Sequence, residues 1–247
     1  MKYKYNNEHE VTYSEVDKNI NLSLLHSIML AQDMMTKYFK TIGSDNYTTK
    51  MKDNSVWVVS KARILINKFP RWLDVLKEES YTTQKKLARV ELETIFKDKK
   101  DNILFIVNHE SCPVDLTTKR IRKINSISYP SDMELEESMQ NKEFSKLNTF
   151  FSDRDICYSF NVKSSDIDFS DHVNNAIYVR YIMDAFTSDY WNHNLIKNFE
   201  IHYIKEAKED QSLTIYKKEL EDGIIDVLIK SDQCEIVRAR IEYIKRV

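Results

Sequence analysis

The spacing of apolar residues predicts a long helix in the first quarter of the chain. Between residues 22 and 42, apolar side chains recur at helical intervals, at Leu24, Leu25, Ile28, Met29, Met35 and Phe39. Gly43 follows where a left-handed residue commonly ends a helix, and Ser23 or Asn21 can cap the start. We therefore expect one amphipathic helix that buries a single face.

Strand-like stretches follow this helix. Runs rich in apolar and β-branched residues predict strands at 56–66, 74–81, 87–96 and 102–109, with a polar turn at 97–101. The first half of the chain is therefore expected to be a helix followed by an antiparallel sheet.

The second half repeats this order. A strand is predicted at 157–162, a helix from Val173 to Phe186, and strands at 198–204, 212–220, 224–231 and 235–244. Asp222-Gly223 is expected to form a hairpin turn. Sliding one half along the other places Leu22 on Val173 and, further along and with a change of loop length, Phe69 on Glu206. The pattern predicts a duplicated unit of class α+β, in which a long helix is wrapped by an antiparallel sheet.

The segment between the halves has a different composition. Residues 131–151 are polar and acid-rich and lack strand periodicity, so we expect a helical linker. The predicted organisation is an N-terminal repeat at 1–130, a linker at 131–151 and a C-terminal repeat at 152–247.

The candidate chemistry is concentrated just before the second helix. Asp168, Ser170 and His172 lie at i, i+2 and i+4, so on an extended backbone they would point to one side at steps of about 6 to 7 Å. A helix start also offers free N–H groups to an oxyanion. Each residue has a structural alternative: Asp168 as a turn or capping residue, Ser170 as a helix cap, and His172 as a local hydrogen-bonding partner.

Three ordered stretches resemble one enzyme family. Asp-x-x-x-His-Val-Asn-Asn-x-x-Tyr, from Asp168 to Tyr178, resembles the signature of the acyl-ACP thioesterases. Tyr203-Ile-Lys-Glu-Ala207 is similar to that family's Tyr-x-x-Glu-Cys or Tyr-x-x-Glu-Ala segment, with Glu206 at its catalytic glutamate. The third stretch comprises residues 11–16, 22–43, 57–59 and 68–72, which look like the family's amino-terminal half. The resemblance spans nearly the whole chain.

This resemblance implies a double hotdog fold and hydrolysis of fatty acyl-[acyl carrier protein], with an acyl-chain pocket in the N-terminal repeat. Asp168, Ser170, His172 and Glu206 would be the catalytic residues, without metal or cofactor. Either carboxylate could be the base or the nucleophile, while His172 polarises the carbonyl or shuttles a proton. The chain departs from the family at Ser170, where asparagine is usual, so a shorter hydroxyl, a water or Asn174 must take its part.

Two other functions stay open at this point. One is a hotdog thioesterase acting on acyl-CoA, because both substrates share the pantetheine arm. The other is a non-catalytic hotdog module that binds acyl chains or acyl carrier protein, which the replacement at Ser170 makes conceivable. Turnover on matched acyl-ACP and acyl-CoA substrates distinguishes these two functions from acyl-ACP hydrolysis.

Composition narrows the classes of partner. Only two glycines occur, which argues against phosphate-cradling and dinucleotide loops, and three scattered cysteines do not form a metal or disulfide framework. The net charge of -2 gives no global basic field for nucleic acid, although Lys119, Arg120, Arg122 and Lys123 form a local basic cluster that could receive an acidic carrier protein.

Targeting signals are not evident in the sequence. No apolar run reaches the length of a membrane span, and the first residues lack the apolar core of a signal peptide and the features of a transit peptide. We therefore expect a cytoplasmic protein. The oligomeric state stays open, a homodimer included. Trp57 and Trp72 are expected to pack between helix and sheet, and the alternative is that they line an acyl tunnel.

Overall fold

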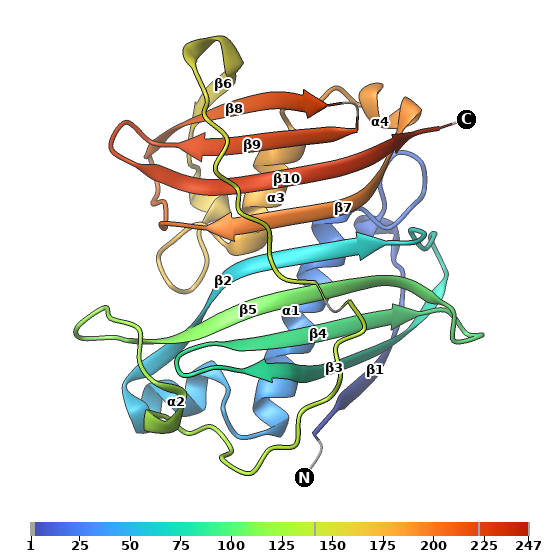
Figure 1. Ribbon diagram of the computed structural model, residues 1–247. Coiled ribbons are helices and arrows are strands. Elements are labelled where there is room, and N and C mark those ends of the chain that lie inside the picture. The colour runs from blue at the N-terminus through green and yellow to red at the C-terminus, as the bar shows by residue number, and fades with distance from the viewer. Residues whose placement is uncertain (1–2, 141, 222, 247) are drawn as a thin grey trace. The chain divides into compact units, whose positions relative to one another are not determined.

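The computed structural model describes residues 3–140, 142–221 and 223–246. The chain forms two compact units, Met1–Glu143 and Phe144–Val247, each with one sheet and one principal helix (Figure 1). The elements of unit 1 are β1 (Tyr5–Glu10), α1 (Leu24–Thr41), α2 (Asn46–Asp53), β2 (Ser55–Ile66), β3 (Val75–Lys85), β4 (Val90–Lys97) and β5 (Ile103–Asp115). Its antiparallel sheet has the order β1-β3-β4-β5-β2.

Unit 2 repeats this topology. Its elements are β6 (Ile156–Asn161), α3 (Asn175–Met183), α4 (Tyr190–His193), β7 (Asn194–Tyr203), β8 (Ser212–Glu221), β9 (Ile224–Lys230) and β10 (Glu235–Lys245). The antiparallel order is β6-β8-β9-β10-β7, which matches unit 1 strand for strand. A helix packed on an antiparallel sheet, present twice, is the predicted double hotdog. No described helix is both long and apolar enough to cross a membrane.

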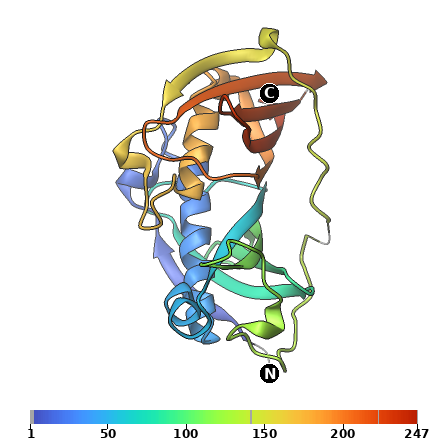
Figure 2. The same ribbon diagram turned by 90° about the vertical axis from the view of Figure 1, so that its left-hand side faces the viewer.

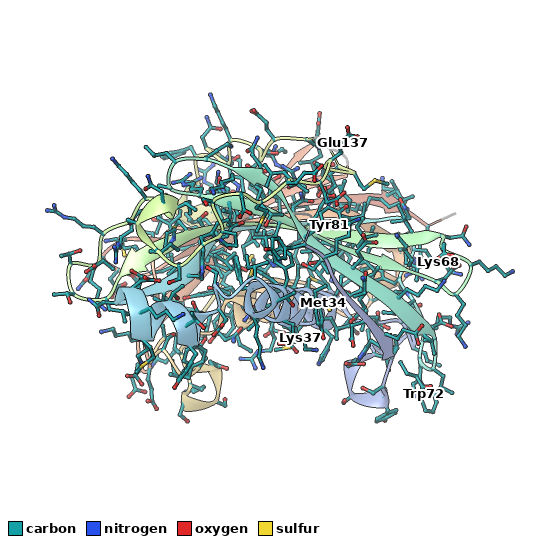
Figure 3. All side chains as sticks on the ribbon, turned by 90° about the horizontal axis from the view of Figure 1, so that it is seen from below. Met34, Lys37, Lys68, Trp72, Tyr81 and Glu137 are labelled. Atoms are coloured by element: carbon teal, nitrogen blue, oxygen red, sulfur yellow. The ribbon has the colours of Figure 1, made fainter. Side chains whose placement is uncertain are left out.

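The core of unit 1 lies between α1 and one face of its sheet. Met34 on α1 faces the sheet and is 1% exposed, whereas Lys37 points away from it (Figure 3). The ring of Trp57 stacks on that of Phe39 at 4.7 Å, as expected for a residue between helix and sheet. The prediction for Trp72 is wrong, because this side chain is 44% exposed and contacts Tyr13 at the surface.

Several element boundaries differ from the sequence-based expectation. Strand β1 and helix α2 were not predicted, because apart from Thr49 none of their residues is buried and their sequences lack an apolar period. Helix α3 has nine residues rather than the expected long run. Phe186, which the expected helix included, lies beyond its end and contacts Trp191, with ring centroids 4.8 Å apart. Of the expected hairpin turn, Asp222 lies outside the described residues, and Gly223 has a φ of +88°.

The predicted helical linker is wrong. The described part of 131–151 contains no helix and follows the face of the unit 1 sheet opposite α1 as far as Glu143 (Figure 2). Glu93, buried on β4, accepts hydrogen bonds from Ser138 Oγ (2.5 Å) and from the N–H groups of Met139 (2.8 Å) and Gln140 (3.1 Å). The segment is extended because its backbone is paired with charged groups of the sheet instead of with itself.

A buried guanidinium continues this attachment in unit 1. Arg63 on β2 is fully buried and donates from Nη1 to the carbonyl of Lys142 (2.8 Å) and from Nη2 to that of Glu143 (2.5 Å). Arg63 and Glu93 are buried charges of opposite sign, and both form hydrogen bonds with main-chain groups of this segment.

The beginning of unit 2 is held in the same manner. Glu200 on β7 accepts from the N–H (2.7 Å) and Oγ (3.2 Å) of Ser145. Arg238 on β10 donates to the carbonyl of Thr149 (2.8 Å), whose hydroxyl in turn donates to Asp226. The segment is thus bound to each sheet by buried or partly buried charged side chains.

We predict that Glu93→Ala lowers the free energy of unfolding by about 1 to 3 kcal/mol, because N–H groups of the segment lose their acceptor. Urea unfolding measures this loss, and limited proteolysis should cut near residues 138–140 sooner. Glu137→Ala, an exposed acid of the same segment, is the control and should change stability by less than about 0.5 kcal/mol. Equal stability of the two variants would contradict the attachment described here.

Candidate active site

The segment before α3 is a closed loop. Ile167 and Val173 form an antiparallel bridge, and Asp168 N–H donates to the His172 carbonyl (3.0 Å). Asp171 closes the loop with a φ of +61° and an N–H bond to the Asp168 carbonyl (3.1 Å). The expectation that Asp168, Ser170 and His172 share one side of an extended backbone is therefore wrong, because the chain turns between them.

The carboxylate of Asp168 organises this loop. Its Oδ1 accepts from Ser170 N–H (2.8 Å) and Ser170 Oγ (2.5 Å), and its Oδ2 accepts from Asn174 Nδ2 (3.4 Å). Asn174 caps α3, since its Oδ1 accepts the N–H of Ala176 (2.9 Å). Ser170 is therefore not the helix cap, and its hydroxyl is directed back to Asp168.

His172 and Glu206 form the central pair. His172 Nε2 lies 3.0 Å from Glu206 Oε2, although the two residues belong to different segments of unit 2. The His172 side chain is 24% exposed and that of Glu206 is 59% exposed. The second ring nitrogen of His172, Nδ1, is enclosed and has no hydrogen-bond partner. With Nε2 donating to the carboxylate, Nδ1 of the neutral ring is a free acceptor.

Glu206 is held through its neighbour Ala207. The carbonyl of Ala207 accepts Val173 N–H (3.0 Å), and its N–H donates to the hydroxyl of Tyr178 (3.0 Å). Tyr178 is 1% exposed, and burial raises the pKa of its phenol above the usual value. Its hydroxyl therefore stays protonated at neutral pH. Sequence reasoning gave Tyr178 no role of its own, although its place in the motif was a signal.

Asp166 anchors the loop to the helix. Its carboxylate accepts from Tyr181 OH (2.6 Å), from Lys163 N–H (3.0 Å) and from the Arg180 guanidinium. Burial alone would raise the pKa of Asp166, but these hydrogen bonds and the charge of Arg180 outweigh it and lower the pKa. Asp166 is thus an ionised support beneath the loop, which the sequence pattern did not reveal.

Unit 1 contains the same loop without the histidine and the glutamate. Asp17 N–H donates to the Asn21 carbonyl (2.8 Å), and Asp17 Oδ1 accepts the N–H groups of Asn19 (2.8 Å) and Asn21 (3.1 Å). Leu22 N–H donates to the Pro70 carbonyl (2.8 Å), just as Val173 does to Ala207. This equivalence agrees with the sequence alignment of the halves. Asn21 thus takes the place of His172, and the residue before Pro70 is Phe69 in place of glutamate.

A metal site does not emerge from the rest of the chain. Within residues 3–140, 142–221 and 223–246, no group of three His, Cys, Asp or Glu side chains could hold a metal ion. His109 and Cys112 are three residues apart on β5, so their side chains point to opposite faces of the sheet. Burial lowers the pKa of His109 to about 4, so this ring is neutral at pH 7.

Comparison with known proteins extends these observations. A sequence model of the acyl-ACP thioesterase N-terminal domain matches residues 2–127, and one of the C-terminal domain matches residues 151–245. A palmitoyl-acyl carrier protein thioesterase of Arabidopsis thaliana is 25% identical over 199 residues, which are 74% of this chain and 48% of that protein. The chain therefore spans about half the length of this curated relative.

Solved structures share the fold over the whole chain. An acyl-ACP thioesterase from Bacteroides thetaiotaomicron superposes with a TM-score of 0.87 at 17% identity, covering 98% of both chains. The 12:0-ACP thioesterase from Umbellularia californica gives 0.81 at 19% identity, again covering 98% of both chains. At these identities, the similarity establishes the fold.

We predict that Asp166→Asn destabilises the protein by about 1 to 3 kcal/mol at pH 7, because charge-assisted bonds to Tyr181 and Arg180 are weakened. The folded-state pKa of Asp166 is lowered, so its contribution is complete above the unfolded-state pKa of about 3.9 and is lost as the pH falls through the lower folded value. Urea unfolding of wild type and variant at several pH values should show their difference shrink below about pH 4. A constant difference would contradict an ionised Asp166.

Proposed function

Because the chain belongs to the acyl-ACP thioesterase family, we propose that it hydrolyses the thioester of fatty acyl-[acyl carrier protein] to free fatty acid and carrier protein. The observation that carries this proposal is the 3.0 Å pair of His172 Nε2 and Glu206 Oε2 within the motif-bearing unit. An exposed carboxylate oriented by a histidine is suited to activate water for attack on a carbonyl.

The geometry supports one division of labour. Glu206, the more exposed member of the pair, takes a proton from the attacking water, while the N–H of His172 Nε2 orients its carboxylate. The water oxygen then bonds to the carbonyl carbon, the carbon–sulfur bond breaks, and the proton passes from Glu206 to the leaving thiolate. In this proposal, His172 and Glu206 are the catalytic residues.

Asp168 and Ser170 have a positioning role in this proposal. Ser170 Oγ donates to Asp168, and Asp168 binds Asn174 at the start of α3, so both stabilise the loop that presents His172. Direct contact of either residue with substrate is not needed for the proposed chemistry.

The N-terminal repeat is the proposed acyl-chain pocket. Helix α1 directs Met34 and Met35 towards the sheet, and both are buried. Methionine side chains adapt to apolar ligands of different shape, which suits a fatty acyl chain. We also propose 1–130 and 152–247 as the two repeats, with 131–151 between them. The cytoplasmic location and a homodimer stay predictions.

The decisive experiment compares purified wild type with His172→Ala and Glu206→Gln on a chain-length series of acyl-ACP. Each substitution should lower kcat by about 10²-fold or more while the folded state, checked by circular dichroism, is kept. Glu209→Gln, an exposed acid three residues beyond Glu206, is the control and should stay within about twofold. Near wild-type kcat in either folded site variant would reject its catalytic role.

Matched acyl-CoA substrates test the main alternative. A higher kcat/KM on acyl-CoA than on acyl-ACP would favour a CoA thioesterase, and absence of free thiol release from both would favour a binding module. The shared pantetheine arm is the reason that both substrates must be compared at equal acyl chain length.

Tyr178 provides a test of how Glu206 is positioned. Tyr178→Phe removes the acceptor of the Ala207 N–H, so we expect kcat to fall about 10-fold with KM little changed and an altered pH profile of kcat. Tyr158→Phe removes another tyrosine hydroxyl bond of unit 2, a partly buried one to the Tyr181 carbonyl (2.8 Å), and is the control. A change in the pH profile of the control, or none in Tyr178→Phe, would refute the positioning role.

A further inference from the structure

Three segments of unit 1 that are distant in sequence meet in one surface, which we call the basic surface: residues 50–55, 85–89 and 115–124. Leu116 N–H donates to the Asn54 carbonyl (2.9 Å), which joins the first segment to the third. Ile124 N–H donates to the Leu87 carbonyl (2.9 Å), which joins the third to the second. The surface is thus built by defined main-chain bonds.

The basic surface concentrates positive charge. Its segments hold nine Lys or Arg residues and two Asp residues, whereas the whole chain has a net charge of -2. Both Asp residues are engaged internally: Asp53 accepts Ser128 N–H (2.7 Å), and Asp115 accepts Thr117 N–H (3.0 Å) and Thr118 N–H (2.7 Å). The exposed cations are Lys50, Lys52, Lys86, Lys119, Arg120 and Lys123, of which Lys86 is paired with Glu91 (3.0 Å).

Apolar side chains lie among these cations. Met51 and Leu87 are each 69% exposed, and Ile121 is 52% exposed. They come from all three segments, one from each, so the surface combines apolar contact area with charge. Exposed apolar side chains within a charged rim are typical of protein interfaces.

We propose that the basic surface docks the acyl carrier protein, an inference that rests on the proposed function. Acyl carrier proteins are small and acidic, so the surface complements their charge and would steer their approach. The whole chain has a net charge of -2, so the residues outside the basic surface are net negative. They would repel an extended nucleic acid or an anionic membrane. A compact acidic protein can contact the basic surface alone.

The test is charge reversal of residues from two segments, in the triple variant Lys52→Glu, Arg120→Glu, Lys123→Glu. Its kcat/KM on acyl-ACP should fall about 10-fold or more at low salt, while kcat/KM on acyl-CoA of the same chain length stays within about twofold. The salt dependence of the acyl-ACP reaction should become weaker. The matched control, Lys68→Glu, Lys99→Glu, Lys100→Glu, makes the same change in net charge on exposed lysines elsewhere in unit 1 (Figure 3 shows Lys68).

Binding of holo-carrier protein without an acyl group is measured in parallel by fluorescence anisotropy. If the triple variant binds more weakly and the control variant does not, the docking surface is supported even if the wild type shows no hydrolysis. The docking proposal and the proposed function can therefore fail separately. Equal losses in variant and control, or an equal loss on acyl-CoA, would overturn the docking surface. Preferential binding of a single-stranded oligonucleotide or of anionic vesicles over carrier protein by wild type would also overturn it.

Discussion

The hydrogen bond from Val173 N–H to the Ala207 carbonyl is the constraint on which the candidate site depends. It ties the loop before α3 to the bend after β7, and His172 and Glu206 are the residues immediately preceding its two ends. Tyr178 fixes the other polar group of Ala207, so the main chain around Glu206 is held from both sides. A 3.0 Å side-chain pair between flexible residues persists because the backbone already brings them together.

The same constraint explains how unit 1 can keep the fold of the loop without a histidine and a glutamate at the corresponding positions. In unit 1, Leu22 N–H and the Pro70 carbonyl make the corresponding bond, and Asp17 closes the loop as Asp168 does. Only the side chains beside the bond differ, with Asn21 and Phe69 in place of a histidine and a glutamate. The architecture of the loop and the proposed catalytic side chains are therefore separable, and the loop alone is no evidence of activity.

Much of this could be predicted from sequence, within limits that have physical causes. Strands such as β8 and β10 were placed within one residue, because their alternating or apolar runs mark a half-buried pleat. The helical linker failed because acid-rich composition does not reveal that Glu93 and Arg63 bind its main chain. The motif identified His172 and Glu206, but their support from Tyr178 and Asp166 depends on contacts between helix and loop that no local spacing encodes.

Buried charges in this protein have two separate uses. Glu93, Arg63 and Glu200 bind main-chain groups of the segment between the repeats, where each charge is compensated by donors or acceptors that the segment must supply in an extended form. Asp166 instead supports the loop before α3 through hydrogen bonds with Arg180 and Tyr181. In contrast, the half-exposed carboxylate of Glu206 has His172 as its partner on a solvent-accessible loop. The carboxylates that support the fold are therefore buried and hydrogen-bonded, whereas the carboxylate proposed to take part in catalysis is exposed to solvent.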